Sequence, residues 1–145
     1  KFWNVYGIEK DHDKAHVITD FIRKGFETGV IDMMTDGMEQ REFLYAEDCC
    51  EALERLRLAS DQFTSDSELH ITSFHSTTIL EIAKIIQGIF KANGKIVAVE
   101  KAQKKDEVQK DARNEANPFI RKWWKAKTSI EDGIEKIFEE MKKDY

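Results

Sequence analysis

Long apolar runs, proline and clustered glycine are all scarce in this sequence. No apolar run approaches the roughly 20 residues that a membrane-spanning helix needs, so no membrane span is expected. The 145 residues include one Pro and seven Gly, while aromatic residues make up 10% and hydrophobic residues 41%. This composition excludes a disordered or low-complexity chain and is sufficient for one domain with a hydrophobic core.

An excess of positive charge is also missing. The formal net charge is −5 at pH 7, although charged residues make up 35% of the chain. Because nucleic-acid binding depends on a basic surface that meets the phosphates, a nucleic-acid partner is not expected. An acidic protein can still hold a small anion in a locally positive pocket.

Cysteine is limited to the neighbouring pair Cys49 and Cys50. A disulfide between sequence neighbours closes a strained ring, so we expect both thiols to be free. This cysteine usage fits a reducing, cytoplasmic setting.

The usual motifs of nucleotide and acyl-transfer chemistry are absent from the sequence. The glycines form no Gly-rich turn between a strand and a helix, no phosphate-binding loop and no GxSxG motif. Tyr6 and Lys10 have the spacing of a catalytic Tyr–Lys pair, but Tyr6 precedes Gly7 at the end of an expected strand rather than on a helix. We therefore assign no catalytic residue.

Two groups of side chains have the chemistry of metal ligands. His12 and His16 would share one face of a helix, but they straddle an expected helix start and lack a nearby third ligand. The pair Cys49-Cys50, taken with His70 or His75, lacks the short ligand spacing typical of zinc sites. No metal site is expected.

Hydrophobic periodicity predicts about four helices and about four short strands. Apolar residues at helical spacing indicate the helices, two of which carry capping-box patterns. The expected helices lie over 17–26, 49–59 (capped by Asp48 with Glu51), 79–90 (capped by Thr78 with Glu81) and 130–141 (starting at Ser129). Strands are expected at 1–7, 41–45, 69–73 and 96–99, with a further short apolar run at 30–34. The pattern indicates a mixed α/β (α+β) domain over 1–145, with the helices packed on a small sheet.

The first seven residues form an apolar, aromatic run where most domains fray. A buried strand at this position indicates that its partners are encoded upstream, and we expect the chain to be the C-terminal piece of a longer protein.

Two further features have binding chemistry. Arg41 lies between a Gly turn and an expected helix, and a guanidinium is suited to bidentate contact with phosphate; the alternative is a surface ion pair with nearby carboxylates. Of the adjacent Trp123 and Trp124, we expect one in the core and the other at a rim, with stacking on a base or sugar as the alternative.

The order of motifs resembles the C-terminal half of the extended short-chain dehydrogenase/reductase family, the NAD(P)-dependent nucleotide-sugar epimerases and dehydratases. Its pattern runs Asn-Val-Tyr-Gly, an Asp-Gly turn, Arg-Asp-Phe-x-Tyr-Val-x-Asp before a helix, a Tyr-Asn-Ile-Gly strand and a Lys-Thr-Ser-Leu-Glu-Glu-Gly-Ile ending. The corresponding segments here are Asn4–Gly7, Asp36-Gly37, Arg41–Asp48, Leu69–Ser73 and Lys127–Ile134. The resemblance implies the substrate-binding part of a Rossmann-type enzyme, without most of its dinucleotide-binding domain.

The resemblance also implies roles for individual residues. Asn4 would contact the diphosphate or the sugar, and Arg41 would clamp the diphosphate. His16 and Val17 correspond to the start of a helix whose N-terminal amides face the diphosphate, a placement that suits an anion.

Other positions correspond to the nucleoside side of the family's site. Met33 and Met34 would lie along the base. Asp106, with Asp111 as the alternative, falls near the family's ribose-binding acidic residue. His70, Thr72 and Ser73 depart from the family pattern, and the sequence assigns neither the sugar nor the base.

Phe2 and Val5 lie where the family's strand passes the nicotinamide. The resemblance implies NAD or NADP as the cofactor of the full-length enzyme, with none bound by this chain alone, because the cofactor loop and catalytic Tyr/Lys belong to the other half. The expected function is the nucleotide-sugar-binding half of an epimerase, dehydratase or reductase, partnered by a cofactor domain and inactive alone. The alternative is a stand-alone binding or assembly module that self-associates through exposed Phe2, Trp3 and Val5.

Overall fold

Four helices and six short strands make up the regular structure of the described residues in the computed structural model. It describes residues 1–11, 15–62, 68–104 and 116–145. The helices are α1 (Val17–Glu27), α2 (Ala46–Leu58), α3 (Ile79–Ala92) and α4 (Ile130–Met141). The strands are β1 (Val5–Tyr6), β2 (Val30–Met33), β3 (Gln40–Glu42), β4 (Leu44–Tyr45), β5 (Ser76–Thr78) and β6 (Ala98–Lys101). The predicted mixed α/β class with four helices is confirmed.

The strands form three two-stranded sheets instead of one small sheet. β1 pairs with β4 and β2 with β6, both in parallel, whereas β3 and β5 pair antiparallel. The predicted strand at 41–45 is divided at Phe43 between two sheets. The predicted strand at 69–73 is reduced to a single bridge between Ile71 and Phe2.

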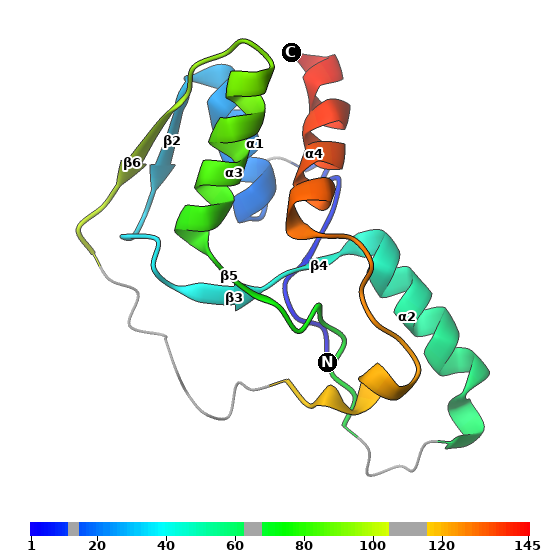
Figure 1. The fold of residues 1–145 in the computed structure, drawn as a ribbon. Helices are drawn as coiled ribbons and strands as arrows, with labels where there is room; N and C mark the ends of the chain where they lie inside the picture. The colour runs from blue at the N-terminus through cyan, green and yellow to red at the C-terminus, as the bar shows by residue number, and fades with distance from the viewer. Residues whose placement is uncertain (12–14, 63–67, 105–115) are drawn as a thin grey trace.

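Helices α1, α3 and α4 pack against one another, and α1 and α3 lie against the β2–β6 pair (Figure 1). Their apolar stripes meet in the larger core, where Ile22, Ile86 and Ile137 are fully buried. Phe90 packs edge-on against both Phe26 and Phe138, with ring centroids 4.8 and 4.9 Å apart. The helical spacing seen in the sequence therefore follows from one shared apolar interior.

Helix α2 lies at the other end of the molecule, beside a second, smaller core (Figure 1). Cys49 and Ala52 of α2 pack there with Trp124, which is buried, while Trp123 is only half-buried. The predicted division of the two tryptophans between core and rim is confirmed. Both cysteines are free, Cys49 buried and Cys50 exposed.

One of the two predicted capping boxes is confirmed, as is the predicted helix start at Ser129. Thr78 and Glu81 form a reciprocal capping box at α3, and the Ser129 hydroxyl accepts from the Asp132 N–H at α4. The predicted Asp48 cap is wrong, because α2 begins at Ala46, two residues before Asp48.

Asp48 instead fastens the chain before α4 to the first turn of α2. Its buried carboxylate accepts hydrogen bonds from the backbone N–H groups of Lys127 and Thr128, at 3.1 and 2.8 Å. The ammonium of Lys127 also pairs with Glu51, the expected partner in the wrong capping box, at 2.6 Å. These contacts fix the position of α4 relative to α2.

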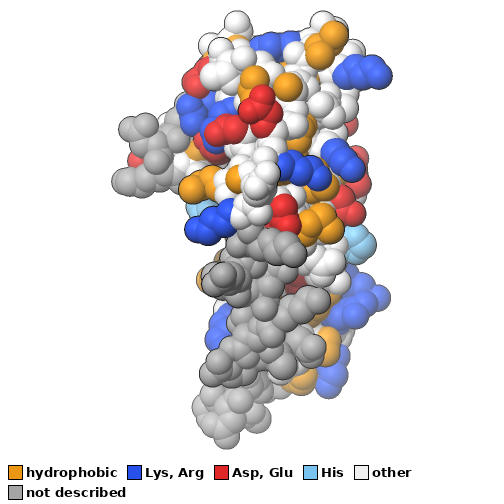
Figure 2. Space-filling model, turned by 90° about the vertical axis from the view of Figure 1, so that its left-hand side faces the viewer, with side chains coloured by type: hydrophobic (Ala, Val, Ile, Leu, Met, Phe, Trp, Pro, Cys, Tyr) orange, Lys and Arg blue, Asp and Glu red, His pale blue; other side chains and the backbone are white. Residues whose placement is uncertain are grey.

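No helix in the described part of the chain is both long and apolar enough to cross a membrane. The face in Figure 2 carries Lys and Arg side chains interspersed with Asp and Glu, and the hydrophobic side chains on it are scattered.

Candidate functional site

Most of the binding residues expected from the sequence line one cavity of about 440 Å³. This volume lies within the usual range for small-molecule sites. The cavity lies between β1, the N-terminal half of α1, the end of β2 and strand β3. Among its lining residues are Asn4, Val5, His16, Val17, Met33, Met34 and Arg41. None of these residues lines the second cavity, of about 580 Å³, which lies on the side of α3 and α4 where those helices begin.

Asn4 enters the cavity from the residue before β1. Its φ of 34° lies in the left-handed region, which Asn tolerates better than most residues. The side-chain amide donates to the Glu42 carbonyl oxygen at 3.0 Å, and the Asn4 carbonyl accepts from the Leu44 N–H at 3.2 Å. The chain around β3 and β4 thus fixes both the backbone and the amide of Asn4.

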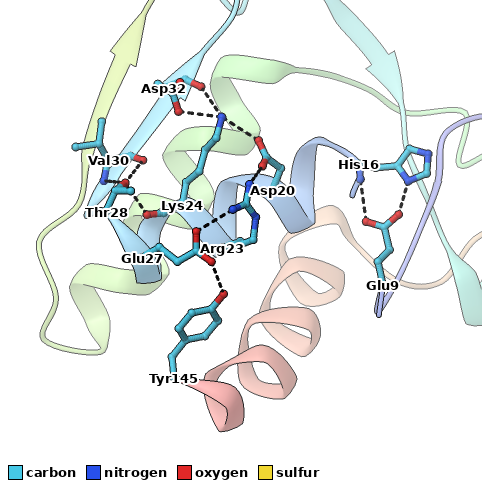
Figure 3. A network of polar contacts seen from close by, with 10 residues as sticks. All are labelled: Glu9, His16, Asp20, Arg23, Lys24, Glu27, Thr28, Val30, Asp32 and Tyr145. Atoms are coloured by element: carbon cyan, nitrogen blue, oxygen red, sulfur yellow. Dashed lines mark hydrogen bonds and ion pairs between the residues drawn. The ribbon is translucent and has the colours of Figure 1, made fainter. Parts of the chain in front are cut away.

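His16 and Val17 begin α1 at the cavity. His16 is the N-cap residue and makes no side-chain capping bond. His16 is instead held by Glu9: one carboxylate oxygen accepts from the His16 backbone N–H at 2.9 Å, and the other contacts His16 Nδ1 (Figure 3). Burial alone would raise the pKa of Glu9, but these hydrogen bonds from His16 hold it below its ordinary value.

Lys24 reaches the cavity from the second turn beyond His16. Its ammonium lies 3.0 Å from an Asp20 carboxylate oxygen and 2.9 Å from one of Asp32, so it joins α1 to β2 (Figure 3). Although burial opposes it, the two carboxylates raise the pKa of Lys24, and Lys24 in turn lowers the pKa of Asp32. The charged lysine is therefore held at the wall of the cavity.

The turn after β2 supplies a further acidic wall. The Thr35 hydroxyl donates to Glu39 Oε1 at 2.6 Å and accepts from the Gly37 N–H at 3.2 Å. Gly37 has a φ of 73° and lies against Met33 and Leu80, so the turn requires glycine. Glu39 is only 6% exposed, and its Oε2 has no hydrogen-bond partner among the described residues.

Arg41 lies half-buried on β3 and also lines the cavity. One of its Nη atoms donates to the Gln40 carbonyl at 2.9 Å. Met33 ends β2 and Met34 follows it, but they differ in setting: Met33 is 5% exposed and belongs to the core, while Met34 is 86% exposed at the rim. The cavity thus combines apolar side chains with two cations, Arg41 and Lys24.

Two of the expected binding residues are not at the cavity. Phe2 does not line it and is 62% exposed. Asp106, like its alternative Asp111, lies outside the described residues. Val5, predicted with Phe2 to meet a cofactor, does line the cavity.

Sequence reasoning missed Lys24, Asp20, Asp32 and Glu39. Helix geometry would have found the first two, because His16, Asp20 and Lys24 recur every four residues and therefore share one face of α1. Asp32 and Glu39 carry no comparable signal, since their positions depend on strands only three and four residues long. Among the described residues, no group of three or more His, Cys, Asp or Glu side chains has a metal-binding arrangement.

Comparison with known proteins shows what this chain is similar to. Residues 1–71 match the sequence model of the NAD dependent epimerase/dehydratase family. The chain is 29% identical to GDP-L-fucose synthase of Sinorhizobium fredii over 94% of its own length and 44% of that enzyme. It is 22% identical to UDP-glucuronic acid decarboxylase 6 of Arabidopsis thaliana, over 98% of this chain and 40% of the relative. The chain therefore spans less than half the length of the curated relatives it matches.

Solved structures share the fold. The epimerase Mth375 of Methanothermobacter thermautotrophicus superposes with a TM-score of 0.78 at 18% identity, over 99% of this chain and 42% of that one. MoeE5, solved in complex with UDP-glucuronic acid and NAD, superposes with a TM-score of 0.71 at 16% identity, over 100% and 46% of the two chains. The fold class predicted from the sequence is confirmed, and the family indicated by the motifs is the one whose model matches.

Proposed function

We propose that this chain is the nucleotide-sugar-binding part of an NAD(P)-dependent sugar-nucleotide epimerase, dehydratase or reductase. The observation that carries the proposal is the convergence of Asn4, His16, Val17 and Arg41 on one cavity. These residues come from three separate segments and were selected only by motif resemblance. Chance gives no reason for all of them to line the same cavity.

The chemistry of the cavity suits a ligand with an anionic centre and an apolar or flat portion. Arg41 offers a planar guanidinium for diphosphate oxygens, and the start of α1 adds a region of positive potential. Met34, at the rim, offers an adaptable apolar surface for a base. Asn4, Asp20 and Asp32 offer acceptors for the hydroxyl groups of a sugar.

We assign the redox step to groups that this sequence does not carry. A nicotinamide cofactor in such an enzyme accepts a hydride from the sugar and returns it. The sequence has no Gly-rich cofactor loop and no helical Tyr–Lys pair. We therefore expect binding of the nucleotide-diphosphate sugar without turnover by this chain alone, with NAD or NADP supplied through a cofactor domain.

A calorimetric titration with UDP-, GDP-, CDP- and dTDP-sugars tests the proposal. At least one should bind, and Arg41→Ala should weaken it more than tenfold, a loss of about 1.4 kcal/mol or more. Arg57→Ala is the matched control, because Arg57 is exposed on α2, pairs with Glu54 there and does not line the cavity. Unchanged affinity in the Arg41 variant would remove the diphosphate role, and NAD-dependent turnover by the chain would refute its proposed inactivity.

A second candidate is an assembly module that self-associates through its N-terminal segment. The large exposed side chains of Phe2 and Ile8, 62% and 55% exposed, favour it, although Trp3 and Val5 are only partly exposed. Light scattering distinguishes the two, since a strict monomer that binds a nucleotide sugar excludes self-association as the function.

A further inference from the structure

Glu9 and His16 form a carboxylate–imidazole pair at the entrance to α1. Glu9 lies after β1, and His16, the N-cap residue of α1, follows seven positions later in the sequence. The carboxylate contacts both the backbone N–H and the ring Nδ1 of His16 (Figure 3). Glu9 is mostly buried, whereas the His16 ring is 71% exposed and lines the cavity.

This contact determines which ring nitrogen carries the proton. An ionised carboxylate only accepts hydrogen bonds, so its contact with Nδ1 requires a proton on that atom. In the neutral ring, Nε2 then holds the free lone pair. Within the described residues, no hydrogen bond reaches Nε2.

We propose that Glu9 is a positioning residue of the cavity, which holds His16 by Nδ1 and so presents Nε2 as an acceptor for a hydrogen-bond donor of the bound ligand. Phosphate oxygens accept and therefore do not complement a bare Nε2. The complementary group is an O–H or N–H, and the hydroxyl groups of the sugar are the richest source of these. The inference rests on the proposed function and assigns His16 to the sugar instead of the diphosphate.

The charged groups of the cavity agree with the assignment of His16 to the sugar and of Arg41 to the diphosphate. Asp20, Asp32 and Glu39 are acceptors. The two cations are Lys24, which pairs with Asp20 and Asp32, and Arg41, to which we assign the diphosphate. Glu9 itself does not line the cavity, and both of its oxygens contact His16.

The ring tautomer is read by long-range ¹H–¹⁵N NMR of the chain, at a pH where titration shows the ring to be neutral. His16→Asn identifies the signal among the four histidines. The wild type should carry its proton on Nδ1. In Glu9→Gln, the amide oxygen still accepts from the backbone N–H and the NH₂ donates to Nδ1, so the proton should move to Nε2. A tautomer unchanged by Glu9→Gln would overturn the inference.

The contribution to binding is measured with Glu9→Ala, using each nucleotide sugar and the matching nucleoside diphosphate. Freeing the ring should weaken nucleotide-sugar binding about fivefold, as expected when one side chain must be ordered on binding. The nucleoside diphosphate should stay within twofold, and Glu27→Ala, at the far end of α1, should change neither. Circular dichroism checks that α1 still forms.

The pattern of losses identifies the donor. A loss confined to the nucleotide sugar assigns the donor to a sugar hydroxyl, and an equal loss for the nucleoside diphosphate assigns it to the base or ribose. Unchanged affinity for both overturns the positioning role. If the wild type binds no nucleotide sugar, the proposed function and the ligand half of the inference both fail, while the tautomer result is decided separately.

Discussion

Substituting Gly133 by Ala should destabilise the chain, although alanine favours a helix. Gly133 lies in the second turn of α4, against β1. A Cβ at this position would lie 2.0 Å from the Tyr6 hydroxyl oxygen and 2.8 Å from its Cζ. Tyr6 is 5% exposed and packs edge-on against Phe43 and Tyr45, so its ring has little room to move.

Two opposing contributions to the free energy of unfolding give the size of the expected loss. Replacing Gly by Ala inside a helix stabilises by about 1 kcal/mol. Overpacking a filled core costs about 1–3 kcal/mol, and a contact this short places Gly133 at the upper end. The expected net loss of stability is about 2 kcal/mol. For a chain of this size, each kcal/mol lost lowers Tm by about 3 °C.

Gly88→Ala is the matched control, because Gly88 lies inside α3 and a Cβ there would meet nothing within 4 Å. It should stabilise by about 1 kcal/mol. Urea unfolding of both variants, followed by circular dichroism, measures the difference of about 3 kcal/mol.

A double-mutant cycle links the effect to the contact. Tyr6→Phe removes the nearest atom, so it should be less harmful in the Gly133→Ala background than in the wild type. If Gly133→Ala proves as stable as Gly88→Ala, the close packing of α4 on β1 is wrong.

Two further substitutions test how the helices are anchored and capped. Asp48→Ala should lose about 3 kcal/mol in urea unfolding, because it leaves the part-buried backbone N–H groups of Lys127 and Thr128 without their acceptor; stability within 0.5 kcal/mol of wild type would contradict this. Thr78→Ala should lose about 1 kcal/mol through the α3 cap, and wild-type stability would contradict the capping box. The hydrogen bonds from the Thr78 backbone and hydroxyl lower the pKa of Glu81 from 4.5, so this stabilisation is present above pH 4.5 and is lost as pH falls through the lowered value. Unfolding measured between pH 7 and pH 3 should show a weaker acid dependence for Glu81→Gln, and an identical pH profile would contradict the assignment.

The helices could be predicted from the sequence because each has an apolar stripe of nearly constant spacing. The strands could not be bounded in the same way, because they are two to four residues long and pair with distant segments. Phe43 illustrates the difficulty: it lies within one apolar run but separates β3 from β4, which belong to different sheets.

Asp48 shows a second limit of local patterns. Its spacing to Glu51 fits a capping box, but its partners lie 79 and 80 residues away. A contact at that separation has no signature in the surrounding sequence.

The candidate site was predictable where motif resemblance reached it. Asn4 and Arg41 were selected in this way and line the same cavity. Glu9 was not, since its link to His16 depends on how the loop before α1 closes.

The most direct test of the central claim is a titration of ¹³C-methyl-methionine-labelled chain with the four nucleotide sugars, followed by NMR. Two of the four methionines, Met33 and Met34, line the cavity, whereas Met141 is buried at the end of α4. A nucleotide sugar should shift the Met33 and Met34 methyl signals saturably and leave Met141 unchanged. The claim is contradicted if no nucleotide sugar produces a saturable shift, or if Met141 shifts as much as Met34.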